Sequence, residues 1–292
     1  MEVVRETAVL RRILGGWRRA GAKVALVPTM GALHEGHLAL VRHGREIAGR
    51  LVVSIFVNPA QFAPGEDFER YPRDEAGDLT RLEALGVDLA YLPDIGAMYA
   101  ADHATWVVVE GPARGLCAEA RPHFFRGVAT VVAKLFNRVQ PDLAIFGEKD
   151  YQQLLVVRRM VRDLDMPVEI VGHPTVREPD GLAMSSRNAY LSPEERRVAP
   201  ELHRVLRDTA EALADGRPAA PLLAAARARL LAAGFTAVDY LEMRDAESLE
   251  PLEAVGTCPA RLLAAARLGA TRLIDNLAVA PVAGCEPNPF SR

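Results

Sequence analysis

The sequence predicts an α/β fold, with a Rossmann-like doubly wound parallel sheet and a smaller C-terminal α+β domain. Over roughly the first two-thirds of the 292 residues, short apolar runs alternate with helical patterns, as in parallel βαβ units whose sheet is covered on both faces. Near residues 184–193 the polar stretch MSSRNAYLSPEE interrupts this alternation. We therefore expect two domains, residues 1–184 and residues 185–292.

Five strands and four helices are predicted for the larger domain. The strands are apolar runs bounded by Gly, Pro, Asn or Asp: KVALVPT (23–29), LVVSIFV (51–57), DLAYLP (88–93), DLAIFG (142–147) and VEIVGHP (168–174). The segments between them carry apolar residues at steps of three and four, which is typical of helices that pack on a sheet. The predicted helices cover residues 37–49, 74–86, 125–140 and 150–164.

The smaller domain begins with a helix-start signal. Ser192 is the predicted N-cap, Pro193 the first helical residue, and Glu195 closes a capping box. Two helices rich in Ala and Leu follow, at about 193–214 and 219–233. The strand-like segments FTAVDYLEMR, RLLAAARLG and TRLIDNLAV then complete an α+β pattern without the βαβ alternation.

Composition narrows the classes of partner. A formal net charge of -3 and a pI near 6.2 give no general attraction for nucleic acid or anionic lipid, so a small molecule is the expected partner. No apolar run is long enough for a membrane span or an export signal, and a cytoplasmic protein is expected. Cys117, Cys258 and Cys285 form no CxxC pair and are expected to be reduced thiols.

Polar segments follow four of the predicted strands. They are TMGALHEGH after the first, NPAQF (58–62) after the second, GEKDYQQ (147–153) after the fourth and TVREPDGLAMSSRN (175–188) after the last. In an open parallel sheet, ligands bind outside the carboxyl ends of the strands. The four segments therefore predict one binding site at this edge.

His34 and His37 lie three residues apart, where the first predicted strand is followed by a helix. HEGH lacks the spacing of the HExxH zinc helix and no third ligand is obvious, so metal ligation is not favoured and any metal ligand stays unknown. Histidines at a helix N-terminus can donate hydrogen bonds to a phosphate held there. Gly31 would let the backbone approach a nucleotide, and Gly36 would leave a flat surface for a base.

These segments, in this order, resemble the pantothenate synthetases (pantoate:beta-alanine ligases, AMP-forming) of the nucleotidylyltransferase superfamily. The motifs that carry the resemblance are VPTMGALHEGH, FVNPAQF, GEDFERYPRD, HFFRGVATVV, FGEKDYQQL and DGLAMSSRN, with VDYLEMRD and AARLGATRLIDN in the second domain. The resemblance implies that ATP drives the condensation of (R)-pantoate with beta-alanine, through a pantoyl-adenylate, to pantothenate, AMP and pyrophosphate. It also implies Mg²⁺ with the ATP, no tightly bound organic cofactor, and a homodimer.

The resemblance assigns the first domain to nucleotide binding and catalysis and makes the second a lid. Catalytic roles are implied for His34, His37, Lys149 and Arg187. The implied ATP-binding residues are Met30, Gly31, Ala32, Leu33, His34, Glu35, Gly36, His37, Gly147, Glu148, Lys149, Asp150, Val176, Met184, Ser185, Ser186 and Arg187. The MSSRN segment is similar to the mobile KMSKS loop of related enzymes, although Ala183 stands before Met184 where that pattern has a lysine.

Gln61 and Gln153 are the expected pantoate-binding residues, because neutral amides can satisfy hydroxyl and carboxylate oxygens without neutralising the nucleophile. Asn58, held extended by the proline that follows it, is expected to orient pantoate or beta-alanine. Asp150 is expected to cap a helix, to contribute to Mg²⁺ through water, or both. Whether His37 transfers a proton or only donates a hydrogen bond stays open.

Two other functions are compatible with a nucleotide site at this edge. The first is a nucleotidylyltransferase of the same superfamily that keeps the nucleotidyl group on its product. Gln61, Gln153 and the GEKDYQQ block argue against it. The second is a regulatory module that binds a nucleotide without turnover, which the presence of His37, Lys149 and Arg187 disfavours. The absence of GxxxxGK[ST] and GxGxxG gives no support to P-loop or dinucleotide-binding functions.

Overall fold

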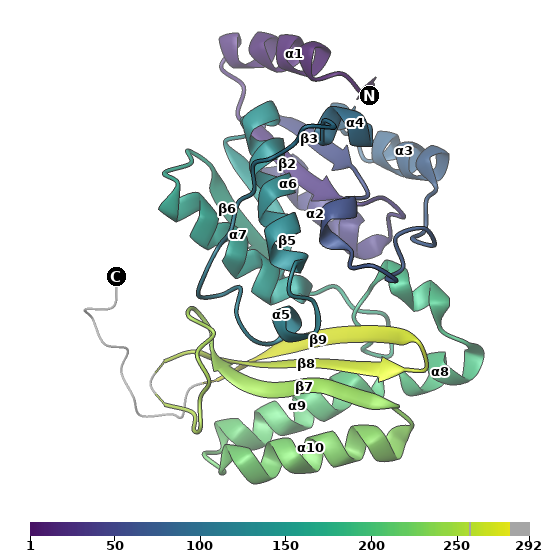
Figure 1. The fold of residues 1–292 in the computed structure, drawn as a ribbon, viewed down its shortest axis with the longest axis vertical. Coiled ribbons are helices and arrows are strands. Elements are labelled where there is room, and N and C mark those ends of the chain that lie inside the picture. Colours follow the sequence, from purple (N-terminus) through teal and green to yellow (C-terminus); the bar gives the residue numbers. More distant parts are fainter. Residues whose placement is uncertain (257, 281–292) are drawn as a thin grey trace. The chain divides into compact units, whose positions relative to one another are not determined.

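The computed structural model describes residues 1–256 and 258–280, and the chain packs as two compact units, Met1–Val176 and Arg177–Arg292 (Figure 1). The first unit is a parallel α/β unit and the second is an α+β unit. The predicted fold class is therefore confirmed. Of the three cysteines, Cys285 lies outside the described residues.

The first unit contains a six-stranded parallel sheet. Its strands are β1 (Glu2–Val4), β2 (Val24–Thr29), β3 (Arg50–Ile55), β4 (Leu89–Tyr91), β5 (Leu143–Gly147) and β6 (Glu169–His173), in the order β1-β4-β3-β2-β5-β6. The chain moves outward from β2 through β3 to β4 and then returns beside β2 as β5. This reversal makes the carboxyl ends of β2 and β5 the switch point where ligands bind in such sheets.

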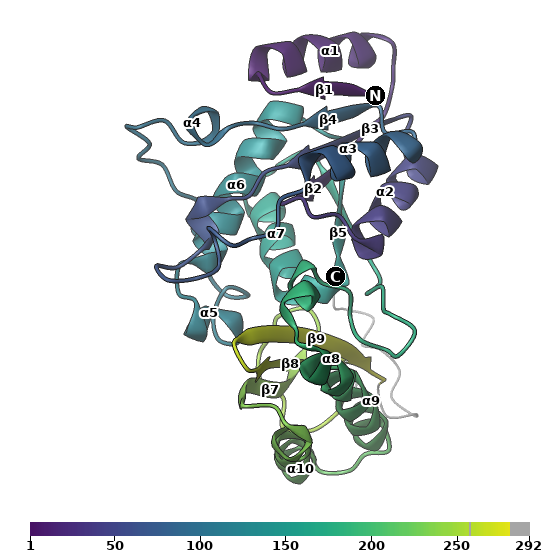
Figure 2. The same cartoon turned by 90° about the vertical axis from the view of Figure 1, so that its right-hand side faces the viewer.

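Two layers of helices cover the sheet. The helices are α1 (Thr7–Arg19), α2 (Glu35–Ile47), α3 (Glu75–Ala84), α4 (Ile95–Met98), α5 (Cys117–Ala120), α6 (Phe124–Val139) and α7 (Tyr151–Asp163), with short 3₁₀ turns η1 (Pro59–Gln61) and η2 (Glu148–Asp150). Figure 2 shows α2 and α3 on one side of the sheet and α6 on the other. The helices predicted at 37–49, 74–86, 125–140 and 150–164 are confirmed as α2, α3, α6 and α7.

Three helices and one strand of the first unit were not predicted. α1 contains two adjacent glycines, which are poor helix formers, and α4 and α5 have four residues each, too few to show a helical period. β1 has three residues at the edge of the sheet. The buried central strands, by contrast, were all predicted because their apolar runs are long.

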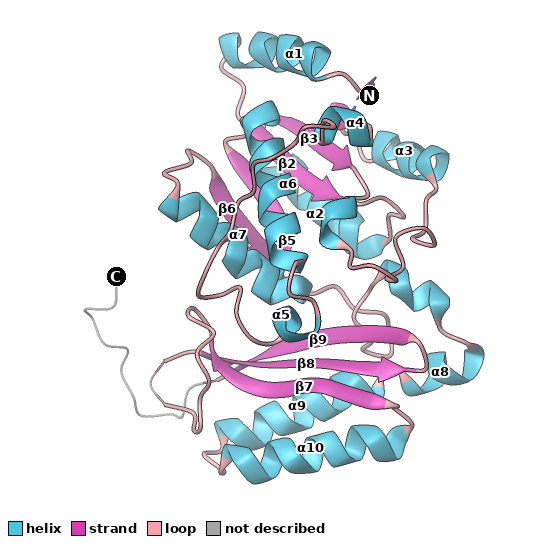
Figure 3. Ribbon diagram, viewed as in Figure 1, coloured by secondary structure: helices cyan, strands magenta, loops and turns pink. Residues whose placement is uncertain are grey.

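The second unit places helices on one face of a three-stranded antiparallel sheet (Figure 3). The strands β7 (Ala237–Asp245), β8 (Ala260–Leu268) and β9 (Thr271–Val279) follow the 3₁₀ turn η3 (Ser186–Tyr190) and the helices α8 (Pro193–Val198), α9 (Glu201–Ala214) and α10 (Ala219–Ala233). The capping box is confirmed, since Ser192 Oγ accepts a hydrogen bond from Glu195 N and Glu195 Oε2 accepts one from Ser192 N. The single helix predicted at 193–214 is wrong. It is divided at Pro200, which lacks the N–H that would continue α8.

Residues 177–184 pack with the second unit. Arg177 donates from Nη1 and Nη2 to the two carboxylate oxygens of Asp275, at 2.6 and 2.9 Å, and Asp275 is buried in β9. Arg177 also forms an isolated antiparallel bridge with Ala183. The expected boundary after residue 184 therefore falls inside the second unit. The helix-start signal at Ser192 suggested that boundary, but residues 177–184, which precede it, already pack with the second unit. Within the described part of the chain, no helix is both long and apolar enough to span a membrane.

Candidate active site

The site candidates of the first unit lie after β2, β3 and β5, neighbouring strands in the centre of the sheet. The loop after β2 leads into α2, and the turn after β5 leads through η2 into α7. Lys149 in that turn is close enough to His37 for its charge to lower the pKa of the imidazole. The structure therefore brings together the first and third of the four predicted segments at the switch point.

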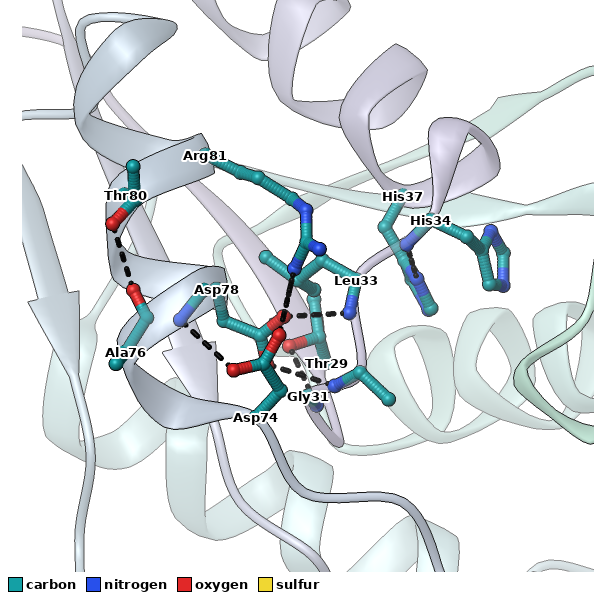
Figure 4. Close-up of polar contacts among 12 residues, drawn as sticks. Thr29, Gly31, Leu33, His34, His37, Asp74, Ala76, Asp78, Thr80 and Arg81 are labelled. Carbon is teal, nitrogen blue, oxygen red and sulfur yellow. Dashed lines mark hydrogen bonds and ion pairs between the residues drawn. The ribbon is translucent and has the colours of Figure 1, made fainter. Parts of the chain in front are cut away.

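His34 and His37 stand at the beginning of α2 with their ring centroids 4.0 Å apart (Figure 4). His34 is the N-cap, and its backbone N–H donates to Nδ1 of His37 at 3.4 Å. Burial lowers the pKa of His37 to about 3, with smaller contributions from His34 and Lys149. His37 is therefore neutral at pH 7. Because Nδ1 accepts, the ring proton sits on Nε2, which makes His37 a hydrogen-bond donor through that atom.

The neutral state of His37 makes stability depend on pH. Between pH about 3 and 6.5 an unfolded His37 binds a proton while the folded one does not, so the free energy of unfolding should rise with pH in this window. His37→Gln removes this contribution. Below pH 6.5 we expect the native protein to lose about 1 kcal/mol per pH unit relative to the variant, measured by urea denaturation. Exposed His123→Gln is the control, and equal pH slopes for the native protein and His37→Gln would contradict the prediction.

Asp78 of α3, a residue that sequence reasoning missed, fixes the loop between β2 and α2 through hydrogen bonds. Its carboxylate accepts hydrogen bonds from Ala32 N at 2.8 Å and Leu33 N at 2.7 Å (Figure 4). Gly31 N donates to Thr29 Oγ1. These three N–H groups point into the protein and are not available to a phosphate. The signal that could have revealed Asp78 is its place four residues before buried Leu82, on the inner face of the helix.

Gly31 serves this packing directly. Its φ of +81° is in the left-handed region, and a Cβ at this position would lie 3.1 Å from both Asp78 Oδ2 and Ile55 Cγ2. The sequence-based explanation, that Gly31 admits a nucleotide, is therefore incomplete. The glycine first allows the loop to lie against α3 and β3.

Lys149 and Asp150 form the turn after β5. The Lys149 side chain is 19% exposed, and its Nζ lies 3.7 Å from Asp150 Oδ2. Asp150 is the N-cap residue of α7, as expected, although its side chain makes no capping hydrogen bond. Among residues 1–256 and 258–280, no cluster of three or more His, Cys, Asp or Glu side chains could hold a metal ion.

Asn58 is buried at 1% exposure, and all of its side-chain hydrogen-bonding capacity is used inside the protein. Its Nδ2 donates to Gly127 O and to Gln61 Oε1, both at 3.1 Å. Its Oδ1 accepts from Tyr99 Oη at 2.8 Å and Ala60 N at 3.3 Å. A backbone carbonyl can only accept and a backbone N–H can only donate, so these contacts fix the orientation of the amide. The expectation that Asn58 contacts a substrate conflicts with this saturated network.

The same contacts fix the orientation of Gln61. Since Gln61 Oε1 accepts from Asn58, its Nε2 is the end that faces away, and this nitrogen lies 3.1 Å from Met30 Sδ. This end of the Gln61 amide is therefore a hydrogen-bond donor. Of the two consecutive glutamines on α7, Gln152 is buried and binds Cys117 N and Pro112 O, whereas Gln153 is partly exposed. Of these two glutamines, Gln153 is the more accessible one.

The HFFRGV segment explains the close approach of α6 to the turn that carries Gln61. A Cβ on Gly127 would lie 2.2 Å from Ala60 O and 2.7 Å from Gln61 N. Arg121 adds a second link, because its Nη2 donates to Gln61 O at 3.0 Å while its guanidinium binds Glu66. Neither link was predicted from the sequence.

The other predicted ATP-binding residues are divided between the two units. Glu35 is exposed on α2 and pairs with Arg42. Gly36 lies in the first turn of α2, Gly147 ends β5, Glu148 opens η2 and Val176 ends the first unit. Met184, Ser185, Ser186 and Arg187 belong to the second unit, where Ser185 Oγ accepts from Arg187 N. Asn188 anchors this segment through hydrogen bonds to Glu178 and Ala183 O.

A family model described as pantoate-beta-alanine ligase matches residues 2–278. The chain belongs to this family. Pantothenate synthetase of Paramagnetospirillum magneticum is 57% identical over 281 residues, covering 96% of this chain and 99% of the relative. Pantothenate synthetase of Sphingopyxis alaskensis is 55% identical over 279 residues, covering 96% of this chain and 100% of the relative.

Solved structures agree with this membership. Pantothenate synthetase of Thermus thermophilus superposes with a TM-score of 0.89 at 51% identity, over 96% of this chain and 100% of that one. Pantoate-beta-alanine ligase of Francisella tularensis, complexed with beta-gamma ATP and beta-alanine, gives 0.81 at 29% identity over 95% and 97% of the two chains. As a member of the pantoate-beta-alanine ligase family matched along nearly its whole length, the chain is a ligase. The expected family and enzyme class are confirmed, and the two alternative functions lose their support.

Proposed function

We propose that this ligase uses ATP to condense (R)-pantoate with beta-alanine, giving pantothenate, AMP and pyrophosphate through a pantoyl-adenylate. The observation that carries this proposal is the meeting of a neutral imidazole donor, His37, with the ammonium of Lys149 at the switch point of the sheet. The carboxylate of pantoate must attack an anionic α-phosphate, so donors and cations must be aimed at oxygens that gain charge. The beta-gamma ATP and beta-alanine bound by the Francisella relative support the same substrates here.

In the proposed mechanism His34 and His37 donate hydrogen bonds to phosphate oxygens, and Lys149 supplies a positive charge beside them. With its pKa near 3, His37 is not an acid at neutral pH, so its role is hydrogen-bond donation rather than proton transfer. Arg187 is also proposed to bind ATP, because a guanidinium can hold a phosphate through two parallel hydrogen bonds. Ala32 and Leu33 contribute the shape of the loop, since Asp78 already accepts their N–H groups.

Gln61 and Gln153 are proposed to bind pantoate. Gln61 would donate from Nε2 to an oxygen of this substrate, because Asn58 holds the other end of the amide. Asn58 itself would act by positioning Gln61 rather than by touching a substrate. This assignment replaces the direct contact expected from the sequence.

The proposal includes Mg²⁺ bound together with ATP. Mg²⁺ sites commonly use one or two carboxylates with substrate phosphates and water, and the half-exposed carboxylate of Asp150 beside Lys149 fits that pattern. When bound, the ion would neutralise part of the phosphate charge. A homodimer, which the family resemblance implies, and a cytoplasmic location complete the proposal.

The test is a pair of measurements on the purified protein. With ATP, pantoate and beta-alanine we expect equal amounts of AMP and pantothenate. With ATP, pyrophosphate and pantoate but no beta-alanine, we expect exchange of pyrophosphate into ATP. A nucleotidylated final product without AMP would instead indicate a nucleotidylyltransferase. ATP binding with no pantoate-dependent release of pyrophosphate would indicate a module without turnover.

A further inference from the structure

Asp78 has a carboxylate at 1% exposure that lies beside the loop leading to the two histidines (Figure 4). It accepts from two consecutive backbone N–H groups, those of Ala32 and Leu33, and its Oδ1 lies 3.3 Å from Arg81 Nη1. Burial raises the pKa of Asp78, although the two N–H groups and Arg81 act in the opposite direction. The partners therefore do not fully offset the desolvation of the carboxylate, and the stability of α3 alone does not account for an aspartate here.

The loop that Asp78 holds has an unusual backbone. Gly31 and Ala32 have φ values of +81° and +50°, and the second is unfavourable for a residue with a side chain. The hydrogen bonds from Ala32 N and Leu33 N to one carboxylate keep the chain in this conformation. The residue that follows is His34, the N-cap of α2, and His37 comes one turn later. Whatever fixes residues 31–33 also fixes where α2 begins and where both imidazoles lie.

We propose that Asp78 is a positioning residue for the ATP site, whose carboxylate holds Ala32 and Leu33 so that the imidazoles of His34 and His37 face the triphosphate. The assignment of ATP to these imidazoles rests on the proposed function. Asp78 touches no substrate in this proposal and acts only through the loop. Replacing Asp78 should therefore change the KM for ATP or kcat more than the KM for pantoate.

A purely structural role for Asp78 in α3 makes a different prediction, and Asp74 provides the matched control. Asp74 caps the same helix by accepting from Gly77 N at 3.0 Å, and it lies 3.4 Å from the same Arg81 Nη1. Its side chain is exposed, and its carboxylate contacts the helix start and Arg81 rather than residues 31–33. Asp74→Ala thus weakens α3 without disturbing the loop.

The experiment compares Asp78→Asn, Asp78→Glu and Asp74→Ala in pantoate-dependent ATP–pyrophosphate exchange. We expect Asp78→Asn to raise the KM for ATP or lower kcat by at least about 10-fold, with the KM for pantoate changed less than about 3-fold. Asp78→Glu keeps the charge but displaces it by one methylene. We expect it too to change the KM for ATP or kcat more than the KM for pantoate, and it provides the test if Asp78→Asn does not fold. Asp74→Ala should stay within about 3-fold of the native protein in every constant.

A readout independent of turnover separates this inference from the proposed function. Histidine NMR should show His37 titrating at higher pH in Asp78→Asn than in the native protein, because the imidazole is released from its buried place. Absence of exchange in the native protein would refute the proposed function, and the His37 titration would still test the positioning role. Equal increases in both KM values, an equal loss in Asp74→Ala, or an unchanged His37 titration in both Asp78 variants would overturn the inference.

Discussion

Replacing Lys149 with alanine is expected to reduce pantoate-dependent pyrophosphate release by at least about 10²-fold while leaving the fold intact. The Lys149 ammonium is 19% exposed, so its charge acts in surroundings where water screens it less than at the open surface. It stands at the end of β5, close enough to His37 to affect the imidazole. A triphosphate bound between the two loops would lose a fixed positive charge at the position where its own charge grows in the transition state.

The fold should tolerate this change because the ion pair between Lys149 and half-exposed Asp150, at 3.7 Å, contributes little to stability. Stopped-flow or coupled detection of pyrophosphate gives the rate, and thermal unfolding gives the stability. Lys23→Ala, which removes an exposed lysine just before β2, is the matched control and should keep the native rate. Near-native turnover in Lys149→Ala would remove this lysine from the mechanism.

The sheet and its edge could be predicted because the signals are local. Each central strand is an apolar run bounded by breakers, and the polar segments follow directly in the chain. Knowing that parallel strands end at one edge was then enough to group TMGALHEGH with GEKD. The order of the strands in the sheet places these two segments beside each other at the switch point.

What the sequence could not reveal depends on contacts between distant residues. In the sequence, Asp78 is an ordinary acidic residue of a helix. Its role becomes visible only in the structure, where α3 packs against a loop that lies more than forty residues earlier in the chain. In the sequence nothing shows that the Asn58 amide is already bonded. Only the structure shows that Gly127 and Tyr99 occupy its hydrogen-bonding groups. The neutral state of His37 likewise follows from burial, which no motif encodes. The individual roles of the predicted ATP and pantoate residues stay predictions until they are measured.

The second large effect is expected from Gly127→Ala, which should lower both stability and pantoate affinity. The new Cβ would lie 2.2 Å from Ala60 O and 2.7 Å from Gln61 N, and both are backbone atoms that cannot turn away as a side chain could. Either α6 or η1 must move, at a cost of about 1–3 kcal/mol or more. Any such shift stretches the hydrogen bond from Asn58 Nδ2 to Gly127 O and tilts the Gln61 amide.

We therefore expect Gly127→Ala to lower the Tm by roughly 3–10 °C, and to raise the KM for pantoate by about 10-fold through the displaced Gln61. The control is Gly16→Ala, since Gly16 is also inside a helix but a Cβ there would meet nothing within 4 Å. That variant should gain about 0.5–1 kcal/mol, because alanine is the better helix former. The two substitutions differ only in what the added methyl group meets. A Tm for Gly127→Ala equal to that of the native protein would mean that α6 does not press on the turn, and the orientation of Gln61 would then need another cause.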